Sequence, residues 1–317
     1  MSRLRVGVVG VGYLGWFHAQ KYAGLEGVDL VGVADLDFAR AEKAAQDFQT
    51  RPFRSHAELG GLVDAVSVAV TTSEHAKVAS ELLSQGIHCL VEKPLSATLA
   101  EADQIIASAE KGGAVLQVGH LERFNPAVAA IRDHLTSPVF MEARRLTTFR
   151  NRGLDVDVIL DLMIHDIDIF LSLTGEMPVE AKAVGAAIVS QRPDVANARL
   201  EFPSGGVADL TASRISNSDC RQLQVFQADS HLRVDCANRT LTVFTKGPGP
   251  GEEILPGVRA QRREFPPADP LLAEIRAFVD AVGQGRPPLV GGREGRRALE
   301  VALKIASQVA PEPGNGG

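Results

Sequence analysis

The first 120 residues alternate short apolar runs with stretches of helical periodicity. The runs are nearly continuous in Val, Ile, Leu and Ala, which is typical of strands buried on both faces of a parallel sheet. Helical stretches such as 37–48 and 75–85 separate them. This alternation predicts an α/β Rossmann domain with a doubly wound parallel sheet over residues 1–120. The predicted strands are 5–9, 29–34, 64–70, 88–91 and 115–118.

Residues 121–317 follow a different pattern. A strongly helical segment near 155–173 precedes a series of strand-like pieces joined by turns such as "PSGG" at 203–206. We expect an α+β domain with a large, mostly antiparallel open sheet, followed by a loop at 247–268 and two helices near 271–282 and 294–309. The predicted strands are 180–189, 196–202, 206–213, 223–228, 230–236 and 240–245.

The open face of that sheet suggests a subunit interface, so we expect a homodimer or homotetramer. The net charge of −6 offers no basic surface to nucleic acid or anionic lipid. The apolar runs are too short to cross a bilayer, and the N-terminal segment reads as a strand and loop. Three cysteines without metal-like spacing, Cys89, Cys220 and Cys236, fit a reducing cytoplasm.

A glycine pattern, Gly10-x-Gly12-x-x-Gly15, follows the first predicted strand and opens a helix. Gly10 permits a tight turn, Gly12 lets the backbone approach a pyrophosphate, and Gly15 allows close packing of helix and strand. The helix N-terminus supplies free N–H groups for phosphates. Tyr13 and Leu14 belong to the same predicted cofactor loop.

The second predicted strand ends in Asp35, twenty residues after Gly15. A carboxylate there accepts a hydrogen bond from a ribose 2′-hydroxyl and repels a 2′-phosphate. Leu36 and Asp37 add no arginine that would offset this repulsion. We therefore predict NAD rather than NADP. The alternative is a glycine turn that binds nothing.

Lys93 follows the fourth predicted strand, within "HCLVEKPLS" at 88–96. Ligands of open α/β sheets bind beyond the carboxyl ends of the strands, so Lys93 shares an edge with the glycine loop. Pro94 restricts the preceding residue to an extended conformation. The alternative is a surface lysine whose ion-pair partner is Glu92.

The helical segment "DVDVILDLMIHDIDIFLSL" carries a narrow polar stripe on an otherwise apolar surface. At 100° per residue, Asp157, Asp161, His165 and Asp168 lie on one side. Buried charged groups are costly unless they are paired or used. Asp161 and His165, one turn apart, suit a carboxylate–imidazole pair aimed into a cleft. A satisfied core network is the alternative.

Zinc is a further alternative for this segment, with His75 or His120 completing the site. Only two of these ligands come from any one local motif, so no metal is expected.

Together these residues resemble the Gfo/Idh/MocA oxidoreductases over essentially the whole chain. The resemblance rests on the glycine motif, "TTSEH" at 71–75, Glu92-Lys93-Pro94, the Asp161 and His165 helix, and "PLLAEIRAFVDAV" at 270–282. It implies hydride transfer between a sugar or polyol carbon and nicotinamide, with catalytic roles for Lys93, Asp161 and His165. It also assigns residues to the cofactor site: Thr71, Thr72, His75, Glu92 and Lys93.

Two stretches, 118–128 and 160–173, are similar to the branch that oxidises UDP-N-acetylglucosamine at its 3-hydroxyl. One departure concerns the substrate loop, because "RNRGLDVDVILD" at 150–161 lacks a glycine pair that many members carry before the catalytic Asp. Arg150 and Arg152 are candidate diphosphate ligands, or solvent-facing side chains. The rival functions are a dehydrogenase of a free sugar or polyol, a tetrapyrrole reductase, and a sensor of NAD or sugar without turnover.

The expected chemistry needs a base within reach of the substrate hydroxyl. His165 is a candidate because imidazole titrates near neutral pH, with Lys93 stabilising the developing alkoxide. Lys93 is the alternative base if its pKa is lowered by desolvation and by the positive ring of NAD. Asp161 positions the sugar or orients His165. Three residues after the last strand of the first domain are predicted to line the cleft: His120, Arg123 and Asn125, unless Asn125 merely starts a helix.

Overall fold

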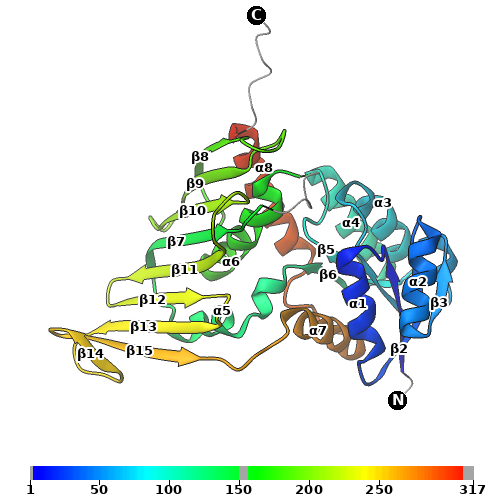
Figure 1. Cartoon of the computed structure of the whole chain (residues 1–317), viewed down its shortest axis with the longest axis horizontal. Coiled ribbons are helices and arrows are strands. Elements are labelled where there is room, and N and C mark those ends of the chain that lie inside the picture. The colour runs from blue at the N-terminus through cyan, green and yellow to red at the C-terminus, as the bar shows by residue number, and fades with distance from the viewer. Residues whose placement is uncertain (1–2, 150–155, 310–317) are drawn as a thin grey trace, which may run out of the picture. The chain divides into compact units, whose positions relative to one another are not determined.

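The computed structural model describes residues 3–149 and 156–309, which fall into two compact units (Figure 1). The first unit takes the chain up to Leu121 together with Asp269–Arg296. The second unit takes Glu122–Ala268 and the residues from Arg297 onward. The sequence-based division placed everything after residue 120 in one domain. This is corrected for Asp269–Arg296, because the apolar stripe of the helix in this segment is buried in the core of the first unit.

The first unit contains a six-stranded sheet with the order β3-β2-β1-β4-β5-β6. All neighbouring strands pair in parallel, which confirms the predicted Rossmann sheet. The sequence pattern missed only β3, whose three residues are too few to show a periodicity. The strands are β1 Leu4–Val9, β2 Val28–Ala34, β3 Arg51–Phe53, β4 Ala65–Val68, β5 His88–Glu92 and β6 Leu116–Gly119.

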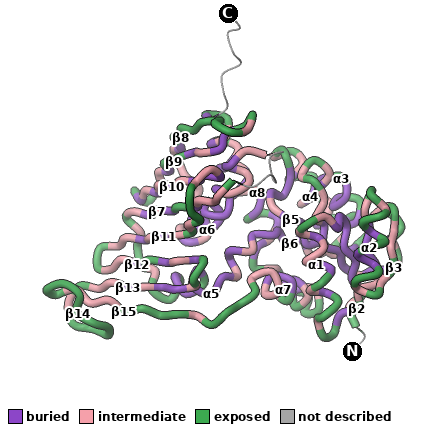
Figure 2. Tube along the Cα trace, in the orientation of Figure 1, coloured by how far each residue is buried: buried purple, intermediate pink, exposed green. Residues whose placement is uncertain are grey.

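Helices cover this sheet, and the strands beneath them are buried (Figure 2). One core cluster joins apolar side chains of β1 and β2 to those of three helices, including Tyr22, Ala44 and Phe278. Burial of these apolar faces, rather than intrinsic helix propensity, is what stabilises such helices. The helices are α1 Tyr13–Ala23, α2 Phe38–Phe48, α3 Thr72–Leu83, α4 Leu99–Gly112 and α7 Pro270–Gln284, with a 3₁₀ turn at His56–Leu59.

The second unit contains a nine-stranded sheet with the order β14-β15-β13-β12-β11-β7-β10-β9-β8. Its pairs are antiparallel except for β7 with β10, which confirms the predicted open, mostly antiparallel sheet. The strands are β7 Pro138–Leu146, β8 Glu180–Ala186, β9 Val195–Glu201, β10 Val207–Ser213, β11 Cys220–Gln227, β12 Ser230–Asp235, β13 Thr240–Lys246, β14 Glu252–Leu255 and β15 Val258–Glu264.

Two parts of this sheet differ from the sequence-based expectation. The predicted loop at 247–268 contains the hairpin of β14 and β15, whose residues are mostly exposed and so show no apolar alternation. The central strand β7 was also missed. Its charged residues Glu142, Arg144 and Arg145 obscure the strand pattern, because Arg145 is buried through ion pairs rather than through apolar contact.

Helices pack on one face of the nine-stranded sheet around an apolar core. Helix α8 begins in the first unit and continues into the second, where Ala298, Val301 and Ile305 join this core. No helix in the described part of the chain is long and apolar enough to span a membrane. The helical elements are α5 Pro126–Ala129, a π-helical turn Ile159–Met163, α6 Ile164–Thr174 and α8 Gly292–Val309, with 3₁₀ turns at Leu121–Phe124 and Ala130–His134.

Candidate active site

The glycine loop has the geometry that a dinucleotide requires. Gly10 has a φ of +81°, and a Cβ there would lie 2.7 Å from the carbonyl oxygen of Ala69. A side chain at Gly15 would collide with the carbonyl of Gly10. Gly12 caps α1 and faces open space, because a Cβ added there would have no atom within 4 Å. The loop therefore brings free N–H groups of α1 to an open surface, where phosphates bind favourably.

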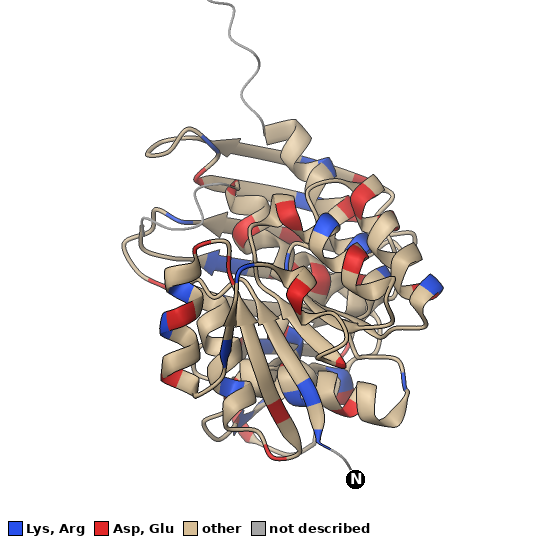
Figure 3. Ribbon diagram, turned by 90° about the vertical axis from the view of Figure 1, so that its right-hand side faces the viewer, with Lys and Arg blue, Asp and Glu red and all other residues tan. Residues whose placement is uncertain are grey.

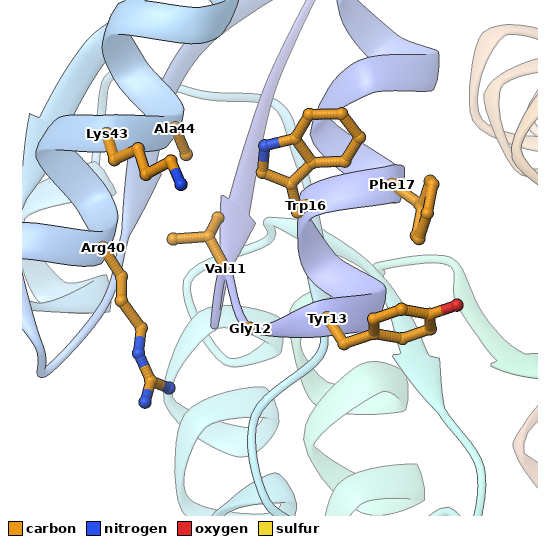
Figure 4. Close-up of a pocket in the computed structure, with 8 residues that line it drawn as sticks. All are labelled: Val11, Gly12, Tyr13, Trp16, Phe17, Arg40, Lys43 and Ala44. Atoms are coloured by element: carbon orange, nitrogen blue, oxygen red, sulfur yellow. The ribbon is translucent and has the colours of Figure 1, made fainter.

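Asp35 lies at the end of β2, directly beside this loop. Its carboxylate accepts hydrogen bonds from the N–H groups of Val11 and Asp37, both at 2.9 Å. Arg40, on α2, forms an ion pair with Asp37 at 3.1 Å. A groove of about 360 Å³ runs alongside, between α1 and α2 (Figure 4). Its lining residues are Val11, Gly12, Tyr13, Trp16, Phe17, Arg40, Lys43 and Ala44.

Lys93 lies at the same sheet edge as the glycine loop. Strands β1, β2, β4 and β5 are parallel, so the residues after their carboxyl ends share one edge. These residues are Gly10, Asp35, Thr71 and Lys93, as the sequence predicts. Lys93 is half-buried, and its peptide bond to Pro94 is cis. Thr71 is exposed and Thr72 is partly exposed at the start of α3.

The side chain of His75, which was predicted to contact a cofactor, makes two contacts within the first unit. This side chain is buried, and its ring nitrogens lie 3.0 Å from the carbonyl oxygen of Pro94 and 3.1 Å from that of Val70. Burial lowers the pKa of His75, although both carbonyls oppose this shift. The imidazole therefore links the loop after β4 to the turn after β5 from within the protein.

Glu92 also uses its side chain inside the first unit, and its predicted role at the cofactor site stays a prediction. The carboxylate is buried and pairs with the equally buried His18 at 2.9 Å. Sequence reasoning missed His18. The signal was a histidine three residues after Gly15, four residues before the buried Tyr22, and therefore on the sheet-facing side of α1.

Asp161 and His165 lie where the helical segment changes its geometry. Asp161 is half-buried within the π-helical turn Ile159–Met163, and His165 is buried in the first turn of α6. A uniform 100° wheel therefore does not describe this segment, and π turns are frequent at functional sites. Asp157 is a helix cap rather than part of the stripe, because its Oδ1 accepts the N–H groups of Ile159 and Leu160 at 2.9 Å.

Two of the predicted cleft residues are engaged within the second unit. Arg123 is buried and donates to both carboxylate oxygens of Asp168 at 3.4 Å. Asn125 caps α5, accepting from the N–H of Ala127 and donating to the carbonyl of Cys236 at 3.0 Å. Both residues therefore hold the chain after β6 in place, and their predicted substrate contacts stay predictions.

The structure gives less information on the remaining predicted residues and on the predicted absence of a metal. His120 is buried at the end of the first unit. Arg150 and Arg152 lie outside the described residues. Within residues 3–149 and 156–309, no group of three or more His, Cys, Asp or Glu side chains is arranged to hold a metal ion. Lys93 belongs to the first unit and Asp161 and His165 to the second, so their joint action remains a prediction.

A set of buried ion pairs next to α6 was not predicted from the sequence. Figure 3 shows the charged residues along the ribbon. Arg145 on β7 binds Asp166 through two hydrogen bonds of 3.0 and 2.7 Å, and Glu122 through one of 2.8 Å. Burial opposes ionisation of Glu122, but the charge and hydrogen bond of Arg145 outweigh it and lower the pKa of this carboxyl. Asp166 directly follows His165, so these ions anchor the helix that carries it.

The fold and the glycine loop define a class: two-domain oxidoreductases that bind a dinucleotide on a Rossmann sheet. Residues 4–120 match the family described as "Oxidoreductase family, NAD-binding Rossmann fold", and residues 99–241 match the "GFO/IDH/MocA C-terminal domain". The chain belongs to the Gfo/Idh/MocA oxidoreductase family, as the sequence motifs indicated.

Several relatives extend along nearly the whole chain, and two of them illustrate the range of identity. UDP-N-acetylglucosamine 3-dehydrogenase of Acidithiobacillus ferrooxidans is 42% identical over 308 residues, covering 96% of this chain and 97% of the relative. A solved structure of that enzyme aligns with a TM-score of 0.93 and 41% identity, covering 98% of both chains. Myo-inositol 2-dehydrogenase of Thermotoga maritima is 27% identical, covering 93% of each chain.

Proposed function

We propose that this protein is an NAD-dependent dehydrogenase that oxidises the 3-hydroxyl of UDP-N-acetylglucosamine or a closely related nucleotide sugar. The observation that carries this proposal is the near full-length similarity, at 42% identity, to a relative of that name. The first unit supports it with an open glycine loop, Asp35 and Lys93 along one sheet edge. A non-catalytic sensor is disfavoured because both Lys93 and His165 are present.

The proposed division of labour follows from the chemistry of each side chain. The N–H groups at the start of α1 hold the pyrophosphate, and Asp35 accepts from the adenosine ribose. A nicotinamide bound along this sheet edge would supply the acceptor for the hydride that leaves the sugar carbon. Lys93 holds the reacting hydroxyl and stabilises its developing negative charge. His165 takes the hydroxyl proton, and Asp161 orients His165 or the sugar.

A nucleotide-sugar panel with NAD, followed by absorbance of the reduced nicotinamide, tests the reaction. We expect turnover of UDP-N-acetylglucosamine, with losses of about 10²- to 10⁴-fold in kcat for Lys93→Ala and His165→Ala. Lys77→Ala, at an exposed position on α3, is the matched control and should retain activity. If the protein turns over only a free polyol, the proposal of a nucleotide-sugar substrate is contradicted. That result would favour the second candidate, an inositol-type dehydrogenase like the Thermotoga maritima relative.

NAD rather than NADP is the proposed cofactor. Asp35 carries a carboxylate beside the glycine loop, where we propose that the ribose binds, and Arg40, one of two cations that line the adjacent groove, is paired with Asp37. Replacing both carboxylates, as Asp35→Ser with Asp37→Ser, removes like-charge repulsion and frees Arg40. We expect the NADP:NAD ratio of kcat/KM to rise about 10- to 100-fold. An unchanged ratio would contradict the role of these carboxylates.

A second copy of the chain is the proposed partner of the open sheet face. Four partly exposed rings stack across β7, β11, β12 and β13, with centroid separations of 5.6, 4.1 and 4.9 Å; they are Phe140, Phe226, His231 and Phe244. Such a row of aromatic side chains is typical of the buried centre of an interface. We expect Phe226→Glu to reduce the mass measured by light scattering to that of a single chain. The three free cysteines are consistent with the cytoplasm as the proposed location.

A further inference from the structure

A chain of buried hydrogen bonds runs from α1 to the residue that precedes Lys93. The hydroxyl of Tyr22 lies 2.9 Å from that of Ser67, on β4. Ser67 lies 3.0 Å from Nδ1 of His18, and Nε2 of His18 lies 2.9 Å from Oε1 of Glu92. All four side chains are buried, so each polar atom in the chain depends on these partners rather than on bulk water.

The order of donors and acceptors along this series of hydrogen bonds follows from Tyr22. Burial raises the pKa of Tyr22 and keeps its phenol protonated, although the hydrogen bond to Ser67 opposes that shift. The phenol proton needs an acceptor, and the oxygen of Ser67 lies 2.9 Å away, so we assign Tyr22 as the donor to Ser67 and Ser67 as the donor to Nδ1 of His18. A neutral imidazole with Nδ1 as acceptor carries its proton on Nε2. That proton is donated to the carboxylate of Glu92, so every group is satisfied in one direction.

Glu92 transmits this arrangement to the turn that bears Lys93. Its second oxygen, Oε2, accepts the backbone N–H of Lys93 at 3.3 Å. The carboxylate also packs against β6, because a Cβ at Gly119 would lie 2.9 Å from its carbon and both oxygens. His18, Lys93 and the β6 backbone thus hold the carboxylate on three sides.

We propose that His18 is a positioning residue for Lys93, acting through the carboxylate of Glu92. The proposal rests on the proposed function in one respect, since it takes Lys93 as the group that contacts the substrate. His18 itself fixes the carboxylate, and the carboxylate fixes the start of the turn from which the Lys93 side chain extends. A displacement of about 1 Å in such a group lowers a rate by up to about 100-fold.

Two variants disturb the carboxylate from opposite sides. His18→Leu removes the donor, and Gly119→Ala pushes on the carboxylate without changing a titratable group. We expect kcat to fall about 10- to 100-fold in both, with the Kd for NAD from calorimetry changed less than about threefold. His18→Gln, whose amide can still donate to Glu92, should recover most of kcat.

Matched controls exist for both substitutions. His56→Leu removes a histidine that pairs with Glu81 at 2.7 Å on the surface of the same unit. Gly283→Ala adds a methyl group where no atom lies within 4 Å. Both controls should retain kcat. If His18→Leu fails to fold, Gly119→Ala decides alone. A kcat within about twofold of the parent in the folded variants overturns the proposal, as does a parallel loss of NAD binding.

Acylation of Lys93 by an N-hydroxysuccinimide ester, followed by mass spectrometry with Lys77 as internal reference, needs no substrate. We expect His18→Leu and Gly119→Ala to change the Lys93 rate at least about threefold relative to Lys77. If the parent protein turns over no sugar, the proposed function fails, and this labelling ratio still tests the inference. An unchanged ratio overturns the inference whatever the substrate proves to be.

Discussion

Each unit buries a polar cluster beside a proposed catalytic residue, and the carboxyl groups of these two clusters have different partners. The first-unit cluster contains two carboxyl groups, one imidazole and two hydroxyls: Glu92, Glu274, His18, Ser67 and Tyr22. The second-unit cluster contains three carboxyl groups and two arginines: Glu122, Asp166, Asp168, Arg123 and Arg145. Guanidinium groups stay charged and bind carboxylates through two bonds, whereas imidazole and hydroxyl groups can donate or accept.

These different partners shift the pKa values of the carboxyl groups in different ways. Arg145 lowers the pKa of Glu122 in spite of burial. Burial, followed by the charge of Glu92, raises the pKa of Glu274 well above its ordinary value, and neither carboxyl oxygen has a hydrogen-bond partner among the described residues. Burial raises the pKa of Asp166, although the charge and hydrogen bonds of Arg145 oppose this shift. The second-unit cluster is thus a set of arginine–carboxyl pairs that anchors α6. The first-unit cluster contains a protonated acid and a directional chain of hydrogen bonds behind Lys93.

Removal of Arg145 should produce the largest effect on stability. Arg145→Met leaves Glu122 and Asp166 buried without their principal cation, and loss of one partner of a buried ion pair costs about 3–5 kcal/mol. Urea denaturation measures the change. Arg221→Met is the control, because Arg221 lies 3.8 Å from the same Glu122 but is 44% exposed, so about 0–1 kcal/mol is expected. Equal losses of unfolding free energy in the two variants would show that burial does not increase the contribution of Arg145 to stability.

The two clusters also show where sequence reasoning succeeds and where it ends. The glycine loop, Asp35 and Lys93 were predictable because strand periodicity and parallel order alone assign them to one sheet edge. The ion pairs of Arg145 were not predictable, because they join β7 to the chain after β6 and to α6, and no local pattern encodes that pairing. The internal bonds of Arg123 and Asn125 were not predictable for the same reason, since the sequence pattern of a polar side chain after a strand is the same whether it faces a cleft or a neighbouring helix.

Glu274 was hidden by a different effect. It lies on the apolar stripe of α7, three residues after Leu271 and four before Phe278, so the helix was predicted correctly while the acid went unremarked. An acid on the buried stripe of an amphipathic helix was the available signal. Its protonation follows from tertiary packing beside Glu92 and Tyr22, which the sequence does not display.

Replacement of Glu274 should have the second-largest effect on stability, and of opposite sign. Glu274→Met removes a buried carboxyl that has no hydrogen-bond partner among the described residues. Its desolvation costs about 1–3 kcal/mol, so the free energy of unfolding should increase. Above its ordinary pKa of 4.5 the unfolded chain releases the proton that the native state retains, so stability falls as pH rises. The gain should therefore be larger at about pH 8 than at about pH 5.

Asp280→Asn is the control for this pH dependence, because Asp280 is an exposed acid on the same helix. Its denaturation curves should follow those of the parent protein at both pH values. A stability gain in Glu274→Met that is equal at the two pH values would mean that Glu274 is ionised in the native state, and the contrast between the clusters would lose its basis.

Tyr22→Phe should have the smallest effect and is the sharpest test of direction within the first-unit cluster. The variant loses one hydrogen bond of 2.9 Å to Ser67, at a cost of about 1 kcal/mol in urea denaturation. Because Ser67 keeps its own proton for His18, kcat should stay close to that of the parent. Ser67→Ala instead removes the donor to Nδ1 of His18 and should lower kcat more than Tyr22→Phe does. If Tyr22→Phe lowers kcat as strongly as His18→Leu, the proton order along the chain is not the one inferred, and Tyr22 rather than Ser67 controls the imidazole.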